Sequence, residues 1–532
     1  MGFWKTTAIV TAGAAALIVG VRLLNPLPQH QPPAPASYPD RSGTALARAI
    51  APQAEAHPGL SGVVPLANSL EAFAARELLA RAAERTLDVQ YYIWHRDKTG
   101  TLMLGEMLRA AERGVRVRIL VDDNGIGGMD DALAALDSHP NAEVRIFNPF
   151  TIRRGKPLLY LTDFRRLNRR MHNKTFTADG VATIVGGRNI GDEYFGAQEG
   201  DLFADLDVLA VGPIATNVEA DFERYWRSAS AYAAAQILHA PPADGISRLR
   251  AEGQAMEESE GARAYVRAVS ETELVSDLLS GDLALEWAEV TMVSDDPAKG
   301  LGKAPPGGTL AERLGAVLDD PERSVKIVSG YFVPGRDGAE ELARLARSGV
   351  EVSVLTNGLG TTDVAVVHSG YAHRRRALLE AGVRLFEMKP DEDASRERLH
   401  LFRRGSALPG SGSGTGPVFR GSGASLHAKT FAKDGERIFI GSFNFDPRSF
   451  DLNTEVGFII DSPGLAGRLE RAFEEDVPGR AYEVRLGEGG RMEWLQTLDD
   501  GRRAVLTTEP HTTLVTRGLV RVLSWLPIEW LL

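Results

Sequence analysis

The feature that most constrains the fold is a residue pattern that occurs twice in the chain. Residues 171–189 read MHNKTFTADGVATIVGGRN, and residues 426–444 read LHAKTFAKDGERIFIGSFN. Histidine, lysine, aspartate and asparagine occupy the same places in both segments, at one constant offset. A single His-x-Lys pattern carries little information, but two copies in register predict two structurally similar halves, each with its own set of functional residues.

The repeat extends to the segments before the motifs. Residues 111–125, AERGVRVRILVDDNG, align with residues 346–360, ARSGVEVSVLTNGLG, and each reads as a helix end, a glycine stop and a β-branched strand. Apolar strand runs, TLDVQYYIWHRD and SVKIVSGYFVPG, precede them, with helical stretches between. Strands that alternate with helices predict an α/β fold in which each half is a mostly parallel sheet flanked by helices.

Changes in composition along the 532 residues suggest domain boundaries. We predict an N-terminal membrane anchor or signal (1–24), a proline-rich linker (25–60), a first lobe (61–240), a connecting segment (241–284), a second lobe (285–490) and a C-terminal membrane-proximal segment (491–532). A Gly/Ser-rich insertion at residues 405–424 precedes the second motif. It reads either as a flexible cover of the site or as an ordinary surface loop.

Both ends of the chain suggest contact with a membrane. The apolar run at residues 8–21, AIVTAGAAALIVGV, is short for a spanning helix, and we favour an uncleaved anchor over a cleaved signal. The C-terminal RVLSWLPIEWLL suits either an interfacial position or packing against the core. A cluster of arginines and lysines at residues 153–170 would attract anionic headgroups.

Overall composition excludes several classes of function. A formal net charge of −11 argues against a general nucleic-acid binder, which usually carries a basic excess. The chain contains no cysteine, so thiolate catalysis and zinc–thiolate sites are excluded.

The alternation of side chains along a strand places His172 and Lys174 on one face, and His427 and Lys429 on one face. Two such pairs in one shared cleft suit a phosphodiester substrate. One histidine can attack phosphorus while the other transfers the protons. The lysines neutralise the phosphate charge, so the chemistry requires no metal and no cofactor.

Other motif residues have less certain roles. We expect Asn189 and Asn444 to help hold the non-bridging phosphate oxygens. Asp179 and Asp434 belong to the same candidate site, but each precedes a glycine, so a structural role in a hairpin turn is the preferred interpretation.

The pattern H-x-K-x4-D-x6-G-[GS]-x-N, present twice, resembles the phospholipase D superfamily. This resemblance implies two pseudo-symmetric α/β lobes with the active site at their interface, and a phosphohistidine intermediate on His172. It also implies an acidic residue downstream of each motif that orients a histidine. The tripeptides LDV and TEV fit that position and give Asp207 and Glu455.

Several further stretches resemble bacterial cardiolipin synthases of the C type, namely LDVQYYIWHRDKTG, VSDDPAKG, GSFNFDPRSFDLNTEVGF and the tail LSWLPIEWLL. The resemblance implies a phosphatidyltransferase of phospholipid biosynthesis in which the headgroup hydroxyl of phosphatidylglycerol attacks the phosphohistidine. Phosphatidylethanolamine is an expected phosphatidyl donor.

Residues 1–24 and the C-terminal tail predict a location at the bacterial inner membrane, and the signal-like N-terminus favours the periplasmic side for the lobes. The expected partners are phospholipids and the membrane surface, without nucleic acid, and a small protein partner stays open. A phospholipase D that forms phosphatidic acid is the main alternative. A superfamily nuclease ranks lower, and a non-catalytic scaffold ranks last because both motifs are intact.

Overall fold

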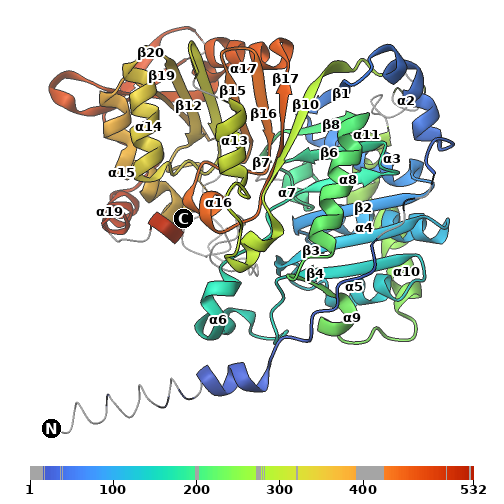
Figure 1. Cartoon of the computed structure of the whole chain (residues 1–532). Helices are drawn as coiled ribbons and strands as arrows, with labels where there is room; N and C mark the ends of the chain where they lie inside the picture. The colour runs from blue at the N-terminus through green and yellow to red at the C-terminus, as the bar shows by residue number, and fades with distance from the viewer. Residues whose placement is uncertain are drawn as a thin grey trace.

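The computed structural model describes residues 40–197, 203–270, 282–318, 321–362, 364–390, 425–498, 500–525 and 529–531, together with residues 18–35 and the single positions 7, 13, 16, 38, 277 and 280. Two lobes of alternating strands and helices lie side by side, the first built from the N-terminal half and the second from the C-terminal half (Figure 1). The insertion at residues 405–424 and most of the N-terminal apolar run fall outside the described residues.

The sheet of the first lobe has the strand order β9–β4–β3–β2–β5–β6–β8–β1. Its strands are β1 (Ser61–Leu66), β2 (Thr86–Ile93), β3 (Arg116–Gly125), β4 (Ala142–Phe147), β5 (Thr175–Ala178), β6 (Ala182–Gly186), β8 (Asp207–Val211) and β9 (Ala231–Ala233).

The second lobe repeats this order as β10–β17–β16–β15–β11–β12–β13–β18 and continues into β19 and β20. Its strands are β10 (Glu286–Ser294), β11 (Ser324–Ser329), β12 (Glu351–Asn357), β13 (Arg384–Met388), β15 (Lys429–Lys433), β16 (Arg437–Gly441), β17 (Val456–Asp461), β18 (Ala481–Leu486), β19 (Met492–Thr497) and β20 (Arg503–Leu506).

The two lobes share one continuous mixed sheet, because β1 and β10 pair antiparallel at their common edge. Only the pairs within β2–β3–β4 and β11–β12–β13 run parallel, and the other pairings described in this sheet are antiparallel. The prediction of mostly parallel lobes was therefore wrong. Each motif folds as a tight hairpin, β5–β6 or β15–β16, and a short turn joins antiparallel strands only.

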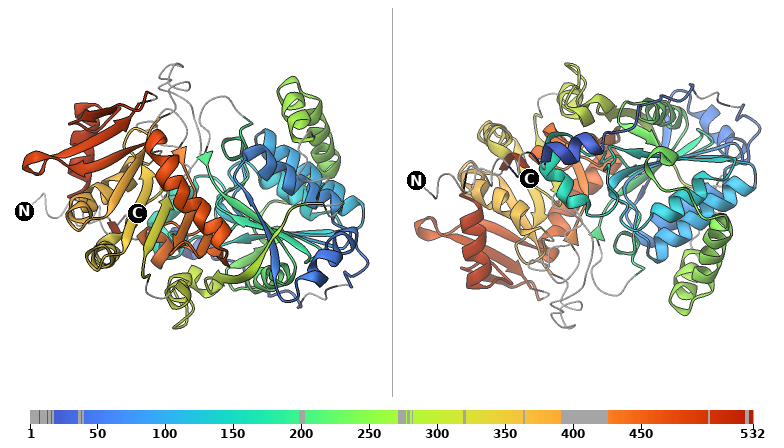
Figure 2. Two further views of the ribbon diagram at one scale, coloured as in Figure 1. Left: turned by 90° about the horizontal axis from the view of Figure 1, so that it is seen from above. Right: turned by 90° about the horizontal axis from the view of Figure 1, so that it is seen from below.

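Helices cover both faces of each half of the sheet (Figure 2). The predicted glycine stops are present at Gly114 and Gly349, whose φ angles of 94° and 98° suit the residue that ends a helix before a buried strand. The main helices are α3 (Ser69–Ala82), α4 (Lys98–Glu112), α5 (Asp130–Asp137), α8 (Pro213–Trp226), α10 (Gly245–Glu258) and α11 (Glu260–Ser270) in the first half, and α13 (Leu310–Leu318), α14 (Gly335–Arg347), α15 (Ala365–Glu380), α17 (Pro463–Glu475) and α19 (Leu514–Leu523) in the second.

Each lobe has its own apolar core, and a third cluster joins the lobes. In this third cluster Val185 of β6 and Val208 of β8 belong with Ile440 of β16 and Phe458 of β17. Burial of these branched and aromatic side chains fixes the lobes against each other. The strands that carry the two motifs therefore face one another across the lobe interface.

Two short elements leave the sheet near the motifs. The 3₁₀ helix η1 (Lys156–Leu159) and helix α6 (Tyr160–Leu167) precede the first motif, and α16 (Pro447–Asp451) follows the second. None of the helices in the described ranges combines the length and apolar character that a bilayer-spanning segment requires.

Candidate active site

The hairpin turns of the two motifs are held by their aspartates. Asp179 and Asp434 adopt positive φ angles of 53° and 54° at the turns. The carboxylate of Asp179 accepts hydrogen bonds from the backbone N–H groups of Glu84, Arg85 and Thr86 at the start of β2. The carboxylate of Asp434 accepts the equivalent three bonds from residues 322–324 at the start of β11. These contacts are structural, as the interpretation of the turns predicts.

The histidines of the two motifs are buried at the lobe interface, and each contacts a carboxylate of the other lobe. His172 is 4% exposed, and its Nδ1 lies 2.9 Å from Oε2 of Glu455. His427 is 2% exposed, and its Nδ1 lies 2.5 Å from Oδ2 of Asp205. A carboxylate on Nδ1 favours the tautomer in which Nδ1 carries the proton, so Nε2 keeps its lone pair for chemistry.

The carboxylate beside His427 belongs to Asp205, whereas the sequence pattern indicated Asp207. Asp207 instead accepts a hydrogen bond from Arg76 Nη2 at 2.8 Å and lies 3.3 Å from Arg188 Nη1. Strand register explains the difference: Gly186 pairs with Asp207, while the equivalent Gly441 of the second lobe pairs with residue 457.

Asp205, two residues earlier, is therefore the true equivalent of Glu455. The sequence alignment of LDV with TEV therefore paired the wrong residues, by two positions. FADLDV contains both aspartates, and the register of each motif hairpin with the next strand shows which of them corresponds to Glu455.

The two motif lysines lie beside the histidines. Lys174 Nζ donates a hydrogen bond to the His172 carbonyl oxygen at 2.5 Å. Lys429 Nζ donates to the His427 carbonyl oxygen and lies 2.9 Å from His427 Nδ1. Burial holds the pKa of Lys174 well below its usual range, and the nearby Lys429 acts in the same direction. Both lysines thus lie in one buried site, where an entering anion would stabilise their charged forms.

Burial and the lysines also keep the histidines neutral. Burial, followed by Lys174 and Lys429, lowers the pKa of His172 well below its usual value. Burial and Lys429 lower the pKa of His427 to about 3, against the opposing effect of Asp205. A neutral imidazole can act as a nucleophile or as a base. The first chemical step needs this protonation state in the histidine that attacks phosphorus.

The motif asparagines differ from each other. Asn189 Oδ1 accepts from the Ile93 N–H at 3.1 Å, and its Nδ2 donates to the Tyr194 hydroxyl at 3.0 Å. The ring of Tyr194 in turn stands edge-on to His427, with 5.4 Å between centroids. Asn444 is buried, and its Oδ1 has no hydrogen-bond partner among the described residues. Asn189 thus supports an aromatic wall, while Asn444 keeps an unused polar atom.

Sequence reasoning missed several residues around the histidines. The ring of Tyr92 stands edge-on to His172, with 5.1 Å between centroids, and lies 5.6 Å from Lys174 Nζ. Ser442 Oγ donates to Oε2 of Glu455, and Ser449 Oγ donates to Oε1 at 2.9 Å. Ser442 is part of the second motif, and Ser449 lies seven residues before the Val456 that opens β17, but no pattern marks either as a partner of Glu455.

One group of metal-ligating side chains lies among the described residues. Atoms of His95, Asp97 and Glu193 lie within 4.8 Å of one another. Both carboxylate oxygens of Asp97 already accept backbone hydrogen bonds, from Gly100 at 2.9 Å and Asp192 at 2.8 Å. Asp97 caps helix α4 in this way, and the group is explained as local structure.

A family model described as "Cardiolipin synthase, PLD-like domain" matches residues 76–226 and 314–477, which include both motifs. The chain belongs to the cardiolipin synthase family of phospholipase D-like proteins. Cardiolipin synthase C of Escherichia coli (strain K12) is 48% identical to it over 487 residues, covering 92% of this chain and 99% of that protein.

The chain is also similar to more distant proteins. A cardiolipin synthase of Staphylococcus aureus (strain Mu50) is 24% identical, covering 78% of this chain and 67% of that protein. The crystal structure of a phosphatidylserine synthase from Haemophilus influenzae Rd KW20 superposes with a TM-score of 0.53 at 15% identity, covering 82% of this chain and 91% of that chain. This structural likeness shows that the two proteins share the fold.

Proposed function

We propose that this protein is a cardiolipin synthase that transfers a phosphatidyl group to the headgroup hydroxyl of phosphatidylglycerol. The observation that carries the proposal is the pair of buried His–carboxylate contacts, exchanged between the lobes and accompanied by both motif lysines. Membership of the cardiolipin synthase family supports it.

In the first step Nε2 of His172 attacks the phosphorus of the donor phospholipid. The new N–P bond forms as the bond from phosphorus to the headgroup oxygen breaks. His427 gives its Nε2 proton to that leaving oxygen, so the headgroup departs as an alcohol. The phosphodiester anion, once bound between Lys174 and Lys429, favours the protonated form of His427 that this transfer needs.

In the second step the now neutral His427 removes the proton from a headgroup hydroxyl of phosphatidylglycerol. The alkoxide oxygen attacks phosphorus, the N–P bond to His172 breaks, and cardiolipin is released. Asp205 and Glu455 hold the two imidazoles in the tautomer and orientation that both steps require.

Phosphatidylethanolamine is the donor that we propose, with ethanolamine as the released alcohol. A phospholipase D would use the same phosphohistidine but admit water as the attacking group. We further propose that the protein acts at the bacterial inner membrane, with the lobes on the periplasmic side.

The test is to incubate the full chain with vesicles of phosphatidylglycerol and phosphatidylethanolamine and identify the products by mass spectrometry. We expect cardiolipin and ethanolamine, and neither product from the matched His172→Ala variant. Phosphatidic acid as the sole product at high phosphatidylglycerol density would assign the protein to the hydrolases instead.

A further inference from the structure

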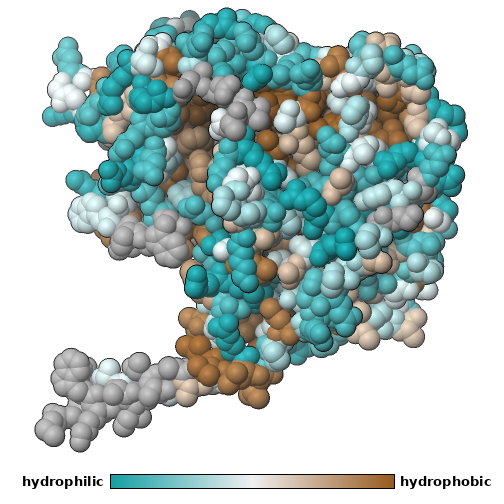
Figure 3. Space-filling view, in the orientation of Figure 1, coloured by the Kyte–Doolittle hydropathy of each residue, from teal (hydrophilic) through white to brown (hydrophobic). Residues whose placement is uncertain are grey.

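The most exposed large apolar side chains of the described residues are concentrated on a few elements. Leu158 of η1 is 70% exposed and Leu161 of α6 is 69% exposed, and Phe164 of α6 extends the same surface. Figure 3 shows this apolar surface at the lower end of the molecule, where the N-terminal segment leaves the lobes. The others lie at Val19, Leu23 and Leu24, at Leu514, Val515, Val522 and Trp525 in and after α19, and at Val505 of β20.

The N-terminal segment is attached to this same surface. Residues 18–24 are helical, and Val21 packs against the small cluster of Phe150, Leu159 and Leu167 beneath η1 and α6. Arg22 also lies 4.0 Å from the carboxylate of Asp163 in α6. The end of the apolar run that the structure describes therefore contacts the lobes at η1–α6.

The charges around the apolar surface complement anionic headgroups. Arg154, just before η1, and Arg165, in α6, are both exposed. Three other basic residues of the segment are engaged with buried carboxylates: Arg153 and Lys156 pair with Asp123, and Arg170 pairs with Asp122. Exposed cations beside exposed leucine and phenylalanine are the combination that binds an anionic bilayer surface.

We propose that η1, α6 and residues 18–24 form a docking face for an anionic phospholipid membrane. The docking face is defined by Leu23, Leu24, Leu158, Leu161 and Phe164, together with the exposed Arg154 and Arg165 of the same segment. This inference rests on the proposed function, because it specifies how the active site meets its lipid substrates. α19 also exposes apolar side chains, but it lies on the second lobe at the left of Figure 1, away from α6, and is not part of the docking face.

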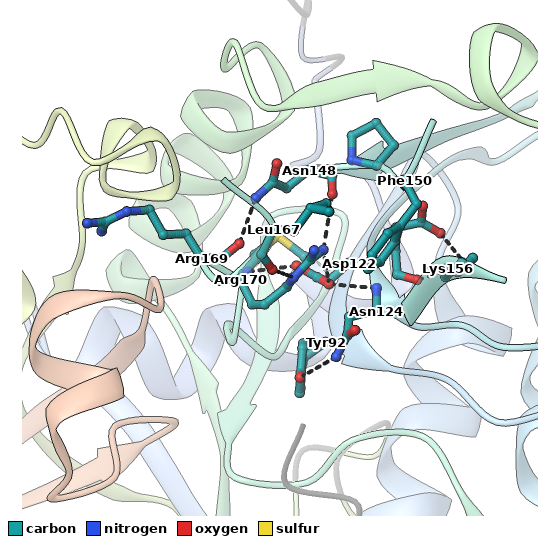
Figure 4. A network of polar contacts seen from close by, with 12 residues as sticks. Tyr92, Asp122, Asn124, Asn148, Phe150, Lys156, Leu167, Arg169 and Arg170 are labelled. Atoms are coloured by element: carbon teal, nitrogen blue, oxygen red, sulfur yellow. Dashed lines mark hydrogen bonds and ion pairs between the residues drawn. The ribbon is translucent and has the colours of Figure 1, made fainter. Parts of the chain in front are cut away.

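A polar network connects the docking face to the first motif (Figure 4). Asp122 accepts hydrogen bonds from the Met171 N–H at 2.8 Å and from Arg170 Nη1 at 3.2 Å. Met171 is the residue immediately before His172, and Lys156 of η1 donates to the adjacent Asp123 at 2.8 Å. The position of η1 is thereby fixed relative to the catalytic strand.

A second chain of contacts runs from α6 to His172. The Tyr160 hydroxyl donates to Asn124 Oδ1 at 3.3 Å, and Asn124 Nδ2 donates to the Tyr92 hydroxyl at 3.0 Å. The Tyr92 ring stands against His172. Through these two sets of contacts, docking of η1 and α6 would hold the active site at a fixed height above the bilayer.

The absence of cysteine allows a direct test on the full chain. Leu161→Cys, labelled with an environment-sensitive fluorophore, should show a blue shift and a severalfold rise in intensity on binding phosphatidylserine-containing vesicles. The matched control is Val505→Cys, because Val505 is 47% exposed but lies on β20 at the opposite end of the molecule. A vesicle-bound protein whose label at 161 still reports water would overturn the proposal. The same shift without vesicles, appearing as protein concentration rises, would assign the face to self-association.

Activity separates the docking face from the proposed reaction. Leu161→Ser with Phe164→Ser should lower the ratio of vesicle activity to activity on monomeric short-chain lipids severalfold, whereas Val505→Ser should leave that ratio unchanged. Arg165→Gln should weaken partitioning onto anionic vesicles by roughly fivefold, the contribution of one cation near such a surface. An unchanged ratio would refute the docking face and leave the synthase proposal intact. If the wild type forms no cardiolipin, while the fluorophore at position 161 still shows the blue shift on vesicles, the synthase proposal alone would be refuted.

Discussion

His172 and His427 occupy equivalent positions ahead of β5 and β15, yet they face different carboxyl groups. Burial raises the pKa of Glu455 to about 7, against the opposing effects of Lys174 and of the Ser442 and Ser449 hydroxyls. Burial would raise the pKa of Asp205 as well, but Lys429 and His427 outweigh it and lower that pKa to about 2. The repeated backbone sets the geometry of both sites, and the neighbouring charges make one carboxyl permanently ionised and the other titratable near neutrality.

The largest expected effect tests whether the two histidines have different roles. His172→Ala should abolish turnover with every substrate, because it removes the proposed nucleophile. His427→Ala should lower turnover by about 10²–10⁴ with a natural donor, since it removes the general acid. A donor with a good leaving group, such as a nitrophenyl phosphodiester, should restore the first step in His427→Ala only. Burst release of nitrophenol measures that step, and a burst from His172→Ala instead would reverse the assignment.

The next effect compares the two carboxyl groups at pH 7. Asp205→Asn should lower kcat by about 10³–10⁴, because a fully ionised partner that orients His427 is replaced by a neutral amide. Glu455→Gln should cost less, since this carboxyl is already partly protonated at that pH. Steady-state kinetics on one substrate measure both, and equal losses would show that the difference in ionisation has no consequence for catalysis.

Asp207→Asn provides the control for this comparison. Asp207 is buried against Arg76 and Arg188, so its loss should lower the free energy of unfolding by about 3–5 kcal/mol while the remaining folded enzyme keeps its kcat. A loss of kcat comparable to that of Asp205→Asn would mean that Asp207, and not Asp205, orients His427.

A third prediction concerns pH. When Glu455 is ionised, it accepts a hydrogen bond from the Nδ1–H of His172, and Nε2 keeps the lone pair that attacks phosphorus. When Glu455 is protonated, it donates to Nδ1 and favours the tautomer with the proton on Nε2. Activity should therefore fall as the pH decreases through about 7, the pKa of Glu455. Glu455→Gln should remove this part of the pH–rate profile. Asp205→Asn should leave it in place, because Asp205 stays ionised down to pH values near 2.

The raised pKa of Glu455 also makes the stability of the protein depend on pH. Because the folded-state pKa lies above the ordinary carboxyl value of 4.5, the contribution of Glu455 to the free energy of unfolding is fully present below pH 4.5 and is lost as the pH rises through 7. Asp205 behaves oppositely, and its contribution is lost only as the pH falls toward 2. Thermal unfolding of Glu455→Gln between pH 5 and 8 should consequently be less pH-dependent than that of the wild type.

Local sequence information was sufficient for the parts of the fold that depend on local structure. The repeat predicted that both motifs form hairpins, and the glycines at 114 and 349 predicted where helices end before strands. It did not predict that β1 pairs with β10 across the lobes, because pairing between distant edges leaves no periodic signal in either strand. The same limit applies to Asp205, whose partner His427 lies in the other lobe.

The arginine cluster at residues 153–170 illustrates a second limit. As a sequence it reads as one basic surface, but Arg170 is fully enclosed with Asp122, and Arg166 lies against Asp163. Asp122 lies 48 positions before Arg170, and Asp163 lies within the cluster, so charge counting along the chain cannot pair them. Only the exposed arginines of the cluster can contribute to membrane binding, and the proposed docking face includes two of them, Arg154 and Arg165.

The smallest expected effect on catalysis comes from the turn aspartates. Asp179→Ala and Asp434→Ala remove acceptors of three backbone N–H groups each, so each should lower the free energy of unfolding by about 1–3 kcal/mol. Asp179 is the more deeply buried of the two, so the N–H groups that its removal leaves unpaired are further from water. The decrease in the free energy of unfolding should therefore be larger for Asp179→Ala than for Asp434→Ala. Denaturant unfolding measures this, with Asp500→Ala as an exposed control expected to unfold at nearly the same denaturant concentration as the wild type. Because neither turn carboxylate contacts a histidine in the hydrogen bonds given above, kcat of the folded enzyme should change little in both variants. A fall in kcat as large as that of Asp205→Asn, without loss of stability, would place the turn aspartates in the chemistry and remove the distinction between the residues that build the hairpins and those that orient the imidazoles.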